Sequence, residues 1–198
     1  MTQKGLSAAG WNISSGDDLL EEDLARQFGI DPIISRILIA RGIVRDDEVK
    51  HFLFPSIKDL YNPYLMMDME RGVERLMRAV SDKEKIVIYG DYDADGITSV
   101  VIFVKFLQDA GIDAFYYIPH RVYEGYGLNR SAIGRFRSEG VSLLVTVDCG
   151  TSDHEEIAYA NSIGMDTIIL DHHEVSDHLP GAVALINPHR RDCNFPFK

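Results

Sequence analysis

The chain has 198 residues, and its 31 acidic and 20 basic side chains give a formal net charge of −11 and a pI near 5.0. Hydrophobic residues make up 45% and charged residues 26%, which is typical of a soluble globular protein and excludes a disordered chain. A charge this negative argues against broad electrostatic binding of nucleic acid by the chain's surface.

Cysteine usage and the apolar segments indicate a cytoplasmic protein. Cys149 and Cys193 form no CxxC pair and no disulfide framework, which fits a reducing compartment. The first 20 residues lack a basic segment followed by an apolar run, and no stretch reaches the length of a membrane span. We therefore expect no membrane partner.

The first part of the chain is predicted to be helical. Residues 1–18 are rich in glycine and serine and show no hydrophobic period, so we expect a loose leader there. Hydrophobic residues three to four apart then predict a helical region over 19–85, in which Pro55 and Pro63 mark a connector. The expected helices span 19–28, 32–41, 46–52 and 69–80.

From Ile86 the pattern changes to short apolar runs that alternate with helical segments. This alternation predicts an α/β domain over 86–198, with a mainly parallel sheet and helices on both faces. Because 187–198 contains no closing element, we expect this domain to be truncated at its C-terminal end. The expected strands are 86–89, 114–118, 143–147, 167–170 and 182–186, and the expected helices are 96–111, 129–140 and 153–164.

Acidic residues follow three of the predicted strands directly: Asp91, Asp148 and Asp171. Ligands of open parallel sheets bind beyond the carboxyl ends of the strands, so we expect the three carboxylates to converge at one edge. The motifs around them add further carboxylates and imidazoles, namely Asp93, Asp95, His172 and His173.

Carboxylates packed this closely repel one another, so the cluster is predicted to bind a cation. Oxygen ligands with one or two imidazoles suit Mn²⁺ or Mg²⁺, and leave Zn²⁺ or Fe²⁺ open. A calcium EF-hand loop does not fit, because its twelfth position would be Ile102 instead of a glutamate and because a strand precedes it.

The segment 119–128 connects a predicted strand to a predicted helix. In it, Gly125 and Gly127 flank Tyr126 and allow close backbone approach to a ligand, and Arg121 offers a planar fork that matches phosphate. Beside the strand ends, this loop is predicted to clamp phosphate; by itself it would be interpreted as an ordinary glycine-rich surface loop. Simpler structural roles are expected for three other residues: Asp153 and Asp166 as helix caps and Cys149 as a buried filler.

The motifs D-Y-D-A-D-G, R-x-x-E-G-Y-G, V-D-C-G and D-H-H together resemble the DHH phosphoesterase superfamily, and within it the exonucleases specific for single-stranded DNA. The likeness extends to the helical lead-in and to the tail INPHRRDC-x-FPFK, and so covers the chain from about Leu24 to Lys198. It implies a 5′→3′ exonuclease of DNA recombination and repair that releases mononucleotides with two Mn²⁺ or Mg²⁺ ions. Such an enzyme is compatible with helicase or single-strand-binding protein partners.

The resemblance also assigns roles to residues. Metal ligands would be Asp93, Asp95, Asp148 and His172. Catalytic roles would fall to Asp91, the first acid of its motif, and to Asp171 and His173, which would orient a ligand and contact the phosphate or leaving group. Substrate contacts would come from Arg121, Gly125, Tyr126 and Gly127.

The family's full enzymes carry a further metal-ligating aspartate and further domains that 1–198 does not contain, so we expect the chain alone to be weakly active or inactive. Two alternatives stay open. One is a phosphodiesterase or pyrophosphatase of the same superfamily that acts on short oligonucleotides, cyclic dinucleotides or pyrophosphate. The other is a non-catalytic scaffold of a replication complex.

Overall fold

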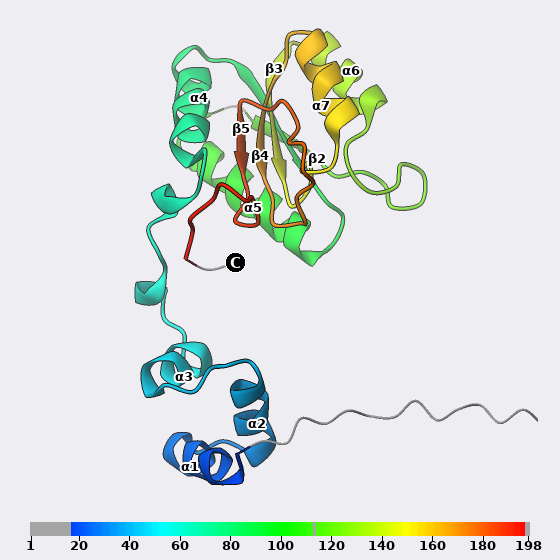
Figure 1. Ribbon diagram of the computed structural model, residues 1–198. Coiled ribbons are helices and arrows are strands. Elements are labelled where there is room, and N and C mark those ends of the chain that lie inside the picture. The colour runs from blue at the N-terminus through cyan, green and yellow to red at the C-terminus, as the bar shows by residue number, and fades with distance from the viewer. Residues whose placement is uncertain (1–16, 113, 197–198) are drawn as a thin grey trace, which may run out of the picture. The chain divides into compact units, whose positions relative to one another are not determined.

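The computed structural model describes residues 17–112 and 114–196 and divides the chain into two compact units, Met1–Leu60 and Tyr61–Lys198 (Figure 1). Of the leader expected over 1–18, residues 1–16 lie outside the described part. Asp17 and Asp18 do not belong to a loose segment: the carboxylate of Asp17 accepts hydrogen bonds from the backbone N–H groups of Leu19 and Leu20, and Asp18 begins the first helix.

The first unit contains three helices among its described residues: α1 (Asp18–Phe28), α2 (Pro32–Ala40) and α3 (Asp46–Leu53). They meet at a small core of Leu24, Leu38 and Val49. The first two helices are also joined by a bidentate pair, in which the Arg36 guanidinium contacts the Glu21 carboxylate at 2.7 Å. Short 3₁₀ turns, η1 (Ile57–Asp59) and η2 (Pro63–Leu65), occupy the expected connector.

Helix α4 (Met69–Ser81), which the sequence places in the helical region before residue 85, belongs to the second unit with the sheet. Its Gly72 lies against the last strand so closely that a Cβ there would come within 2.9 Å of the Ile186 side chain. The compact units therefore divide at 60/61, because the packing of α4 on the sheet joins it to the strands that follow.

The second unit is built on a five-stranded parallel sheet in the order β2-β1-β3-β4-β5. This confirms the predicted α/β fold. Several element ends differ from the expected ones by one or two residues. The strands are β1 (Lys85–Gly90), β2 (Ala114–Tyr117), β3 (Val141–Val147), β4 (Asp166–Leu170) and β5 (Ala184–Ile186); the remaining helices are α5 (Ala94–Asp109), α6 (Arg130–Ser138) and α7 (His154–Ser162).

Helices cover both faces of the sheet, α6 and α7 on one and α4 and α5 on the other (Figure 1). Side chains alternate along β1 accordingly: Val87 and Tyr89 join the core under α6 and α7, whereas Ile86 and Ile88 join the core under α4 and α5. The chain leaves β1 toward β2 on one side and returns to β3 on the other, so the topological switch point lies between β1 and β3.

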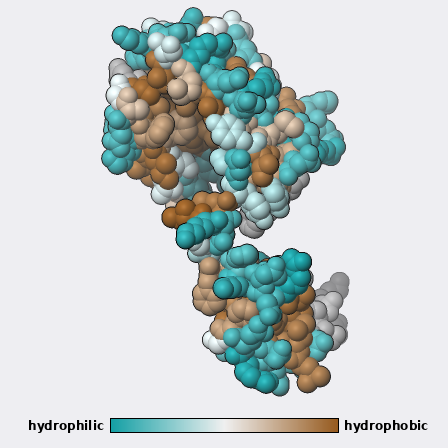
Figure 2. Space-filling view, turned by 90° about the vertical axis from the view of Figure 1, so that its left-hand side faces the viewer, coloured by the Kyte–Doolittle hydropathy of each residue, from teal (hydrophilic) through white to brown (hydrophobic). Residues whose placement is uncertain are grey.

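An apolar groove of about 340 Å³ remains between α4 and α5, with Val145, Ile168 and Ile186 among its lining residues. Figure 2 views the molecule from the side that carries α4 and shows apolar side chains gathered there. None of the helices in the described residues combines the length and the apolar character needed to cross a membrane.

Candidate active site

The three aspartates that follow strands converge at the carboxyl edge of the sheet, beside the switch point. Asp91 follows β1, Asp148 follows β3 and Asp171 follows β4, and all three are buried. Backbone hydrogen bonds extend the sheet to them, since the N–H of Asp148 donates to Leu170 O at 2.9 Å and that of Asp171 to Ile186 O at 3.1 Å. The sheet itself therefore places the carboxylates.

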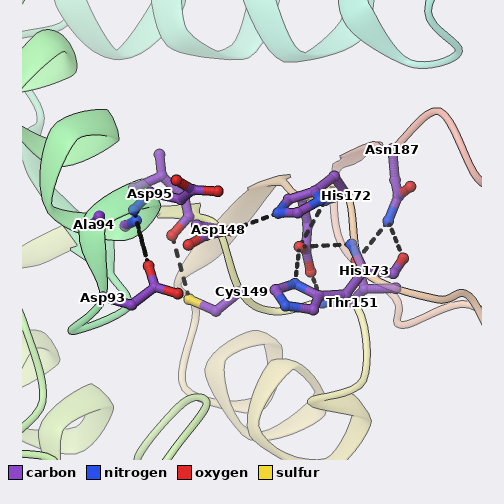
Figure 3. Close-up of polar contacts among 12 residues, drawn as sticks. Asp93, Ala94, Asp95, Asp148, Cys149, Thr151, His172, His173 and Asn187 are labelled. Carbon is purple, nitrogen blue, oxygen red and sulfur yellow. Dashed lines mark hydrogen bonds and ion pairs between the residues drawn. The ribbon is translucent and has the colours of Figure 1, made fainter. Parts of the chain in front are cut away.

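Two overlapping sets of side chains could each hold a metal ion. One consists of Asp91, Asp93 and Asp148 and the other of Asp148, His172 and His173; within each set the ligand atoms lie within 4.8 Å of one another. Asp148 belongs to both and lies between the acidic motif and the histidine pair (Figure 3). An arrangement with one shared carboxylate suits two neighbouring cations.

Asp148 is held in an unfavourable backbone and electrostatic state. Its φ of 60° is left-handed, which is uncommon for any residue other than glycine, although aspartate and asparagine adopt it more readily than most. Burial and then the nearby charge of Asp93 raise the pKa of its carboxyl group, and His172 Nε2 contacts its Oδ1 at 2.9 Å. A divalent cation would relieve the repulsion between these two carboxylates.

Asp91 provides the test of whether the residues present fit a metal ion. Its side chain is 5% exposed, and Oδ1 has no hydrogen-bond partner among the described residues. A buried carboxylate oxygen without a partner is costly unless a cation binds it. Gly96 has no side chain and so lets α5 begin close to Asp91, because a Cβ at residue 96 would come within 2.4 Å of the Asp91 backbone. The donor set therefore fits a hard divalent cation.

The other two acids of the first motif differ from each other. Asp93 Oδ1 accepts hydrogen bonds from the backbone N–H groups of Asp95 and Gly96 and so caps α5, and Asp93 also belongs to one of the two ligand sets. This cap explains why α5 begins two residues before the expected start. Asp95, although expected to bind metal, lies in neither ligand set; it lines an open cavity of about 250 Å³ at the site, together with Asp148 and His172.

The buried Asp171 carboxylate is hydrogen-bonded to the more exposed imidazole of His173, with Asp171 Oδ1 2.7 Å from His173 Nδ1. Burial alone would raise the pKa of Asp171, but hydrogen bonds from Thr151 and His173 bring it below its usual range. The same bond to Asp171 raises the pKa of His173. Asp171 therefore orients the imidazole and favours its charged form, which suits a group that contacts phosphate.

The glycine-rich loop reaches both halves of the site. The Arg121 guanidinium lies 5.2 Å from the centre of the Tyr92 ring, which places it beside the acidic motif. The Tyr126 hydroxyl lies 3.4 Å from the ring nitrogens of His173. Gly125 and Gly127 both have positive φ, of 80° and 84°. The structure thus brings the predicted phosphate clamp next to the predicted ligands.

Side chains outside the expected set hold this loop in place. Glu124 accepts hydrogen bonds from the backbone N–H of His120 and from the Tyr117 hydroxyl. The Tyr89 hydroxyl donates to Gly127 O at 3.0 Å. Asp153, expected to be a helix cap, makes no such bond with α7, and its carboxylate instead accepts from the backbone N–H of Leu128.

Two more residues outside the expected set, Thr151 and Asn187, link the loops after β3, β4 and β5. Nothing in the local sequence indicates these partners, since they lie 14 to 36 residues apart. The interpretation of Cys149 as a buried filler is confirmed, because it is 1% exposed and burial raises the pKa of its thiol. Asp166 is not a helix cap: it begins β4 and pairs with Arg75.

Residues 85–195 match the model of the DHH family, N-terminal domain. The chain is 38% identical over 188 residues to the single-stranded-DNA-specific exonuclease RecJ of Bacillus subtilis (strain 168), which covers 95% of this chain and 24% of that protein. It is 36% identical over 168 residues to the RecJ exonuclease of Escherichia coli (strain K12), which covers 84% of this chain and 28% of that protein.

A solved structure of exonuclease RecJ bound to manganese matches with a TM-score of 0.61 and 30% sequence identity, over 67% of this chain and 34% of that one. The chain spans about a quarter of the length of the curated relatives it matches. The family match covers more than half of the chain and includes every residue of the site described above. The chain therefore belongs to the DHH family.

Proposed function

We propose that this chain carries the metal-binding edge of a metal-dependent 5′→3′ exonuclease that hydrolyses single-stranded DNA to mononucleotides in recombination and repair. The observation that supports this most is the pair of ligand sets sharing Asp148, with a buried oxygen on Asp91 that has no hydrogen-bond partner in the described part of the chain. The family and the RecJ relatives supply the reaction class and the substrate, and the relative bound to manganese suggests Mn²⁺, with Mg²⁺ as the other candidate.

Asp91, Asp93, Asp148 and His172 would hold the cations. When bound, divalent cations activate water and neutralise charge on the phosphoryl group. The chain's own residues would do the rest of the positioning. His173, charged and oriented by Asp171, would contact the phosphate or the leaving oxygen. Arg121 would bind the 5′-terminal phosphate through its planar fork, and Tyr126 would confine the backbone of the strand beside His173. Asp95 would add its negative charge to the open cavity that it lines with Asp148 and His172.

The proposal is tested by supplying the chain with Mn²⁺ at high protein concentration and comparing four substrates: 5′-labelled single-stranded DNA, duplex DNA, a dinucleotide and pyrophosphate. We expect slow, Mn²⁺-dependent release of mononucleotides from the single strand, slow because the relatives are about four times longer. Asp148→Asn is expected to abolish it. Release at the same rate from Asp148→Asn would contradict the proposed site.

The alternative enzyme of the same family would hydrolyse the dinucleotide or pyrophosphate faster than the long single strand. An open site beside the Arg121 loop favours long single-stranded DNA over small substrates. The cavity lined by Asp95 and His172 is not covered by any of the described residues, so a DNA strand could enter it. A scaffold without catalysis would bind no Mn²⁺. Helicase or single-strand-binding protein partners belong to this proposal as well and are tested by co-purification with the chain.

A further inference from the structure

We propose that Asn187, which lies outside all four motifs, is a positioning residue for the histidine pair of the metal centre. This inference rests on the proposed function, because it assigns a role within the same site. Asn187 directly follows β5 at the carboxyl edge of the sheet and is completely buried. Its side chain points at the loop that carries His172 and His173 (Figure 3).

The Asn187 amide uses both of its donor hydrogens and its acceptor. Nδ2 donates to the backbone oxygen of His173 at 2.9 Å and to the Thr151 hydroxyl at 3.1 Å, while Oδ1 accepts from the backbone N–H of His189 at 2.9 Å. A carbonyl oxygen can only accept and a backbone N–H can only donate, so these partners fix which way the amide points. The side chain therefore ties three segments together in one orientation.

Together with the bonds of Asp171, these bonds hold the backbone of the loop that carries His172 and His173 (the histidine loop) at both ends. At its start, Asp171 Oδ1 accepts from the backbone N–H groups of His172 and His173, and Asp171 Oδ2 accepts from the backbone N–H of Thr151. At its end, the backbone oxygen of His173 is held by Asn187. Thr151 thus meets both supports, through its backbone at Asp171 and through its hydroxyl at Asn187.

Backbone support matters here because packing does not hold the imidazoles. The side chains of His172 and His173 are 59% and 44% exposed, although His172 must present a ring nitrogen to the cation and His173 must face the substrate beside it. Removing the Asn187 amide would take this donor away from the backbone oxygen of His173 and from the buried Thr151 hydroxyl, and the loop would shift or admit water. The rings would then lose the orientation that places them with Asp148.

The test is a Mn²⁺ titration of the full chain and of matched variants, with thermal unfolding measured on each. We expect Asn187→Ala to weaken Mn²⁺ binding about tenfold. Thr151→Val, which removes one of the two bonds and keeps the side-chain shape, should weaken it less, and Thr151→Ser should retain wild-type affinity. The control is Asn161→Ala: Asn161 also donates its amide to the β4–β5 connection, at Gly181 O, away from the site.

A merely structural role would lower the unfolding temperature of Asn187→Ala and Thr151→Val without changing their Mn²⁺ affinity, and that result would overturn the inference. If Asn187→Ala does not fold, the pair Thr151→Val and Thr151→Ser decides in the same way. Absence of Mn²⁺ binding by the wild-type chain would instead overturn the proposed function, and this inference with it.

Discussion

At the scale of single residues, the site depends on backbone conformations that few side chains allow. Asp148 adopts a left-handed φ where both ligand sets meet, and Gly127 adopts one in the loop that faces them. Such conformations persist only when surrounding contacts hold them, and they cluster at functional sites. Here the contacts are the strand ladder at Asp148, the hydrogen bond that the Tyr89 hydroxyl donates to Gly127 O, and the one that Leu128 N–H donates to the Asp153 carboxylate.

Two glycines of the loop allow a direct comparison of what an added Cβ costs in stability. Gly125 and Gly127 have nearly the same positive φ, but a Cβ would meet nothing within 4 Å at Gly125 and would lie 2.7 Å from Asp153 Oδ1 at Gly127. We expect Gly125→Ala to lower the free energy of unfolding by about 1–2 kcal/mol through backbone strain alone. Gly127→Ala should cost more, because the half-buried Asp153 carboxylate must also move. Urea unfolding of both variants measures the difference, and equal costs would refute the steric role of Asp153.

Asp93 combines two roles that one pair of variants separates. Asparagine caps helices as well as aspartate does, so Asp93→Asn should leave the free energy of unfolding within a few tenths of a kcal/mol of wild type. It should nevertheless weaken Mn²⁺ binding, since it removes a charged ligand. Asp93→Ala should lose both roles, with about 1 kcal/mol of stability. Chemical denaturation and Mn²⁺ titration check this; wild-type Mn²⁺ affinity in Asp93→Asn would remove Asp93 from the ligands.

At the scale of elements, a network of charges joins α4 to the amino ends of β1, β3 and β4. The Arg75 guanidinium, 5% exposed, contacts Glu84 at 2.7 Å and Asp166 at 2.5 Å, and the Ser142 hydroxyl also donates to Glu84. A buried guanidinium is stable only when it is fully paired. This network lies at the edge opposite the site, and so it fastens α4 without touching the ligands.

The network predicts a pH dependence of stability. The hydrogen bond from Arg75 lowers the pKa of Glu84 below its ordinary value of 4.5. A carboxyl group whose pKa is lower in the folded state stabilises the fold above its unfolded pKa, and that contribution is lost as the pH falls through the folded pKa. Glu84→Gln should therefore be less stable than wild type at pH 7, by about 1–3 kcal/mol, and the difference should shrink below pH 4.5.

Equilibrium unfolding at pH 7 and pH 3 measures that difference. Glu155→Gln, a change of an exposed glutamate in the first turn of α7, serves as the control and should behave like wild type at neutral pH. A Glu84→Gln destabilisation that is the same at both pH values would show that the ion pair does not account for it.

The elements themselves were largely predictable from the sequence, and their long-range partners were not. Short β-branched runs such as 86–89 alternate with helical segments, a local signal that predicts the parallel sheet and the edge where Asp91, Asp148 and Asp171 meet. The roles of Asp153 and Asn187 depend on hydrogen bonds to residues far away in the chain. No local pattern marks such a contact. The packing of α4 on β5 is likewise a long-range contact, so the local sequence around α4 does not predict it.

At the scale of the whole molecule, the sheet unit contains every candidate ligand and loop residue, whereas the three-helix unit has a core of only three buried hydrophobic side chains among its described residues. The net charge of −11 is likewise partly local, since five of the acidic residues gather at the site, where cations would offset them. The acidity of the chain therefore does not argue against a nucleic-acid substrate at this edge.

This division predicts that the shorter chain 61–198 folds by itself. It retains the sheet, the helices on both of its faces and the Arg75 network. We therefore expect a single cooperative thermal transition and a Mn²⁺ affinity within about twofold of that of the full chain. Calorimetry and metal titration on the two lengths make the comparison. A shorter chain that fails to fold, or that loses Mn²⁺ binding, would show that the first unit supports the site.

The central claim is that a divalent cation binds where Asp148 is shared between two ligand sets, and Mn²⁺ titration of the chain against its Asp148→Asn variant tests it most directly. Asparagine tolerates the left-handed φ of 60° at this position, so the variant should fold while it loses the shared charge. We predict measurable Mn²⁺ binding by the wild-type chain and a loss of at least about tenfold in the variant. Equal affinities of the two proteins would contradict the assignment of the site.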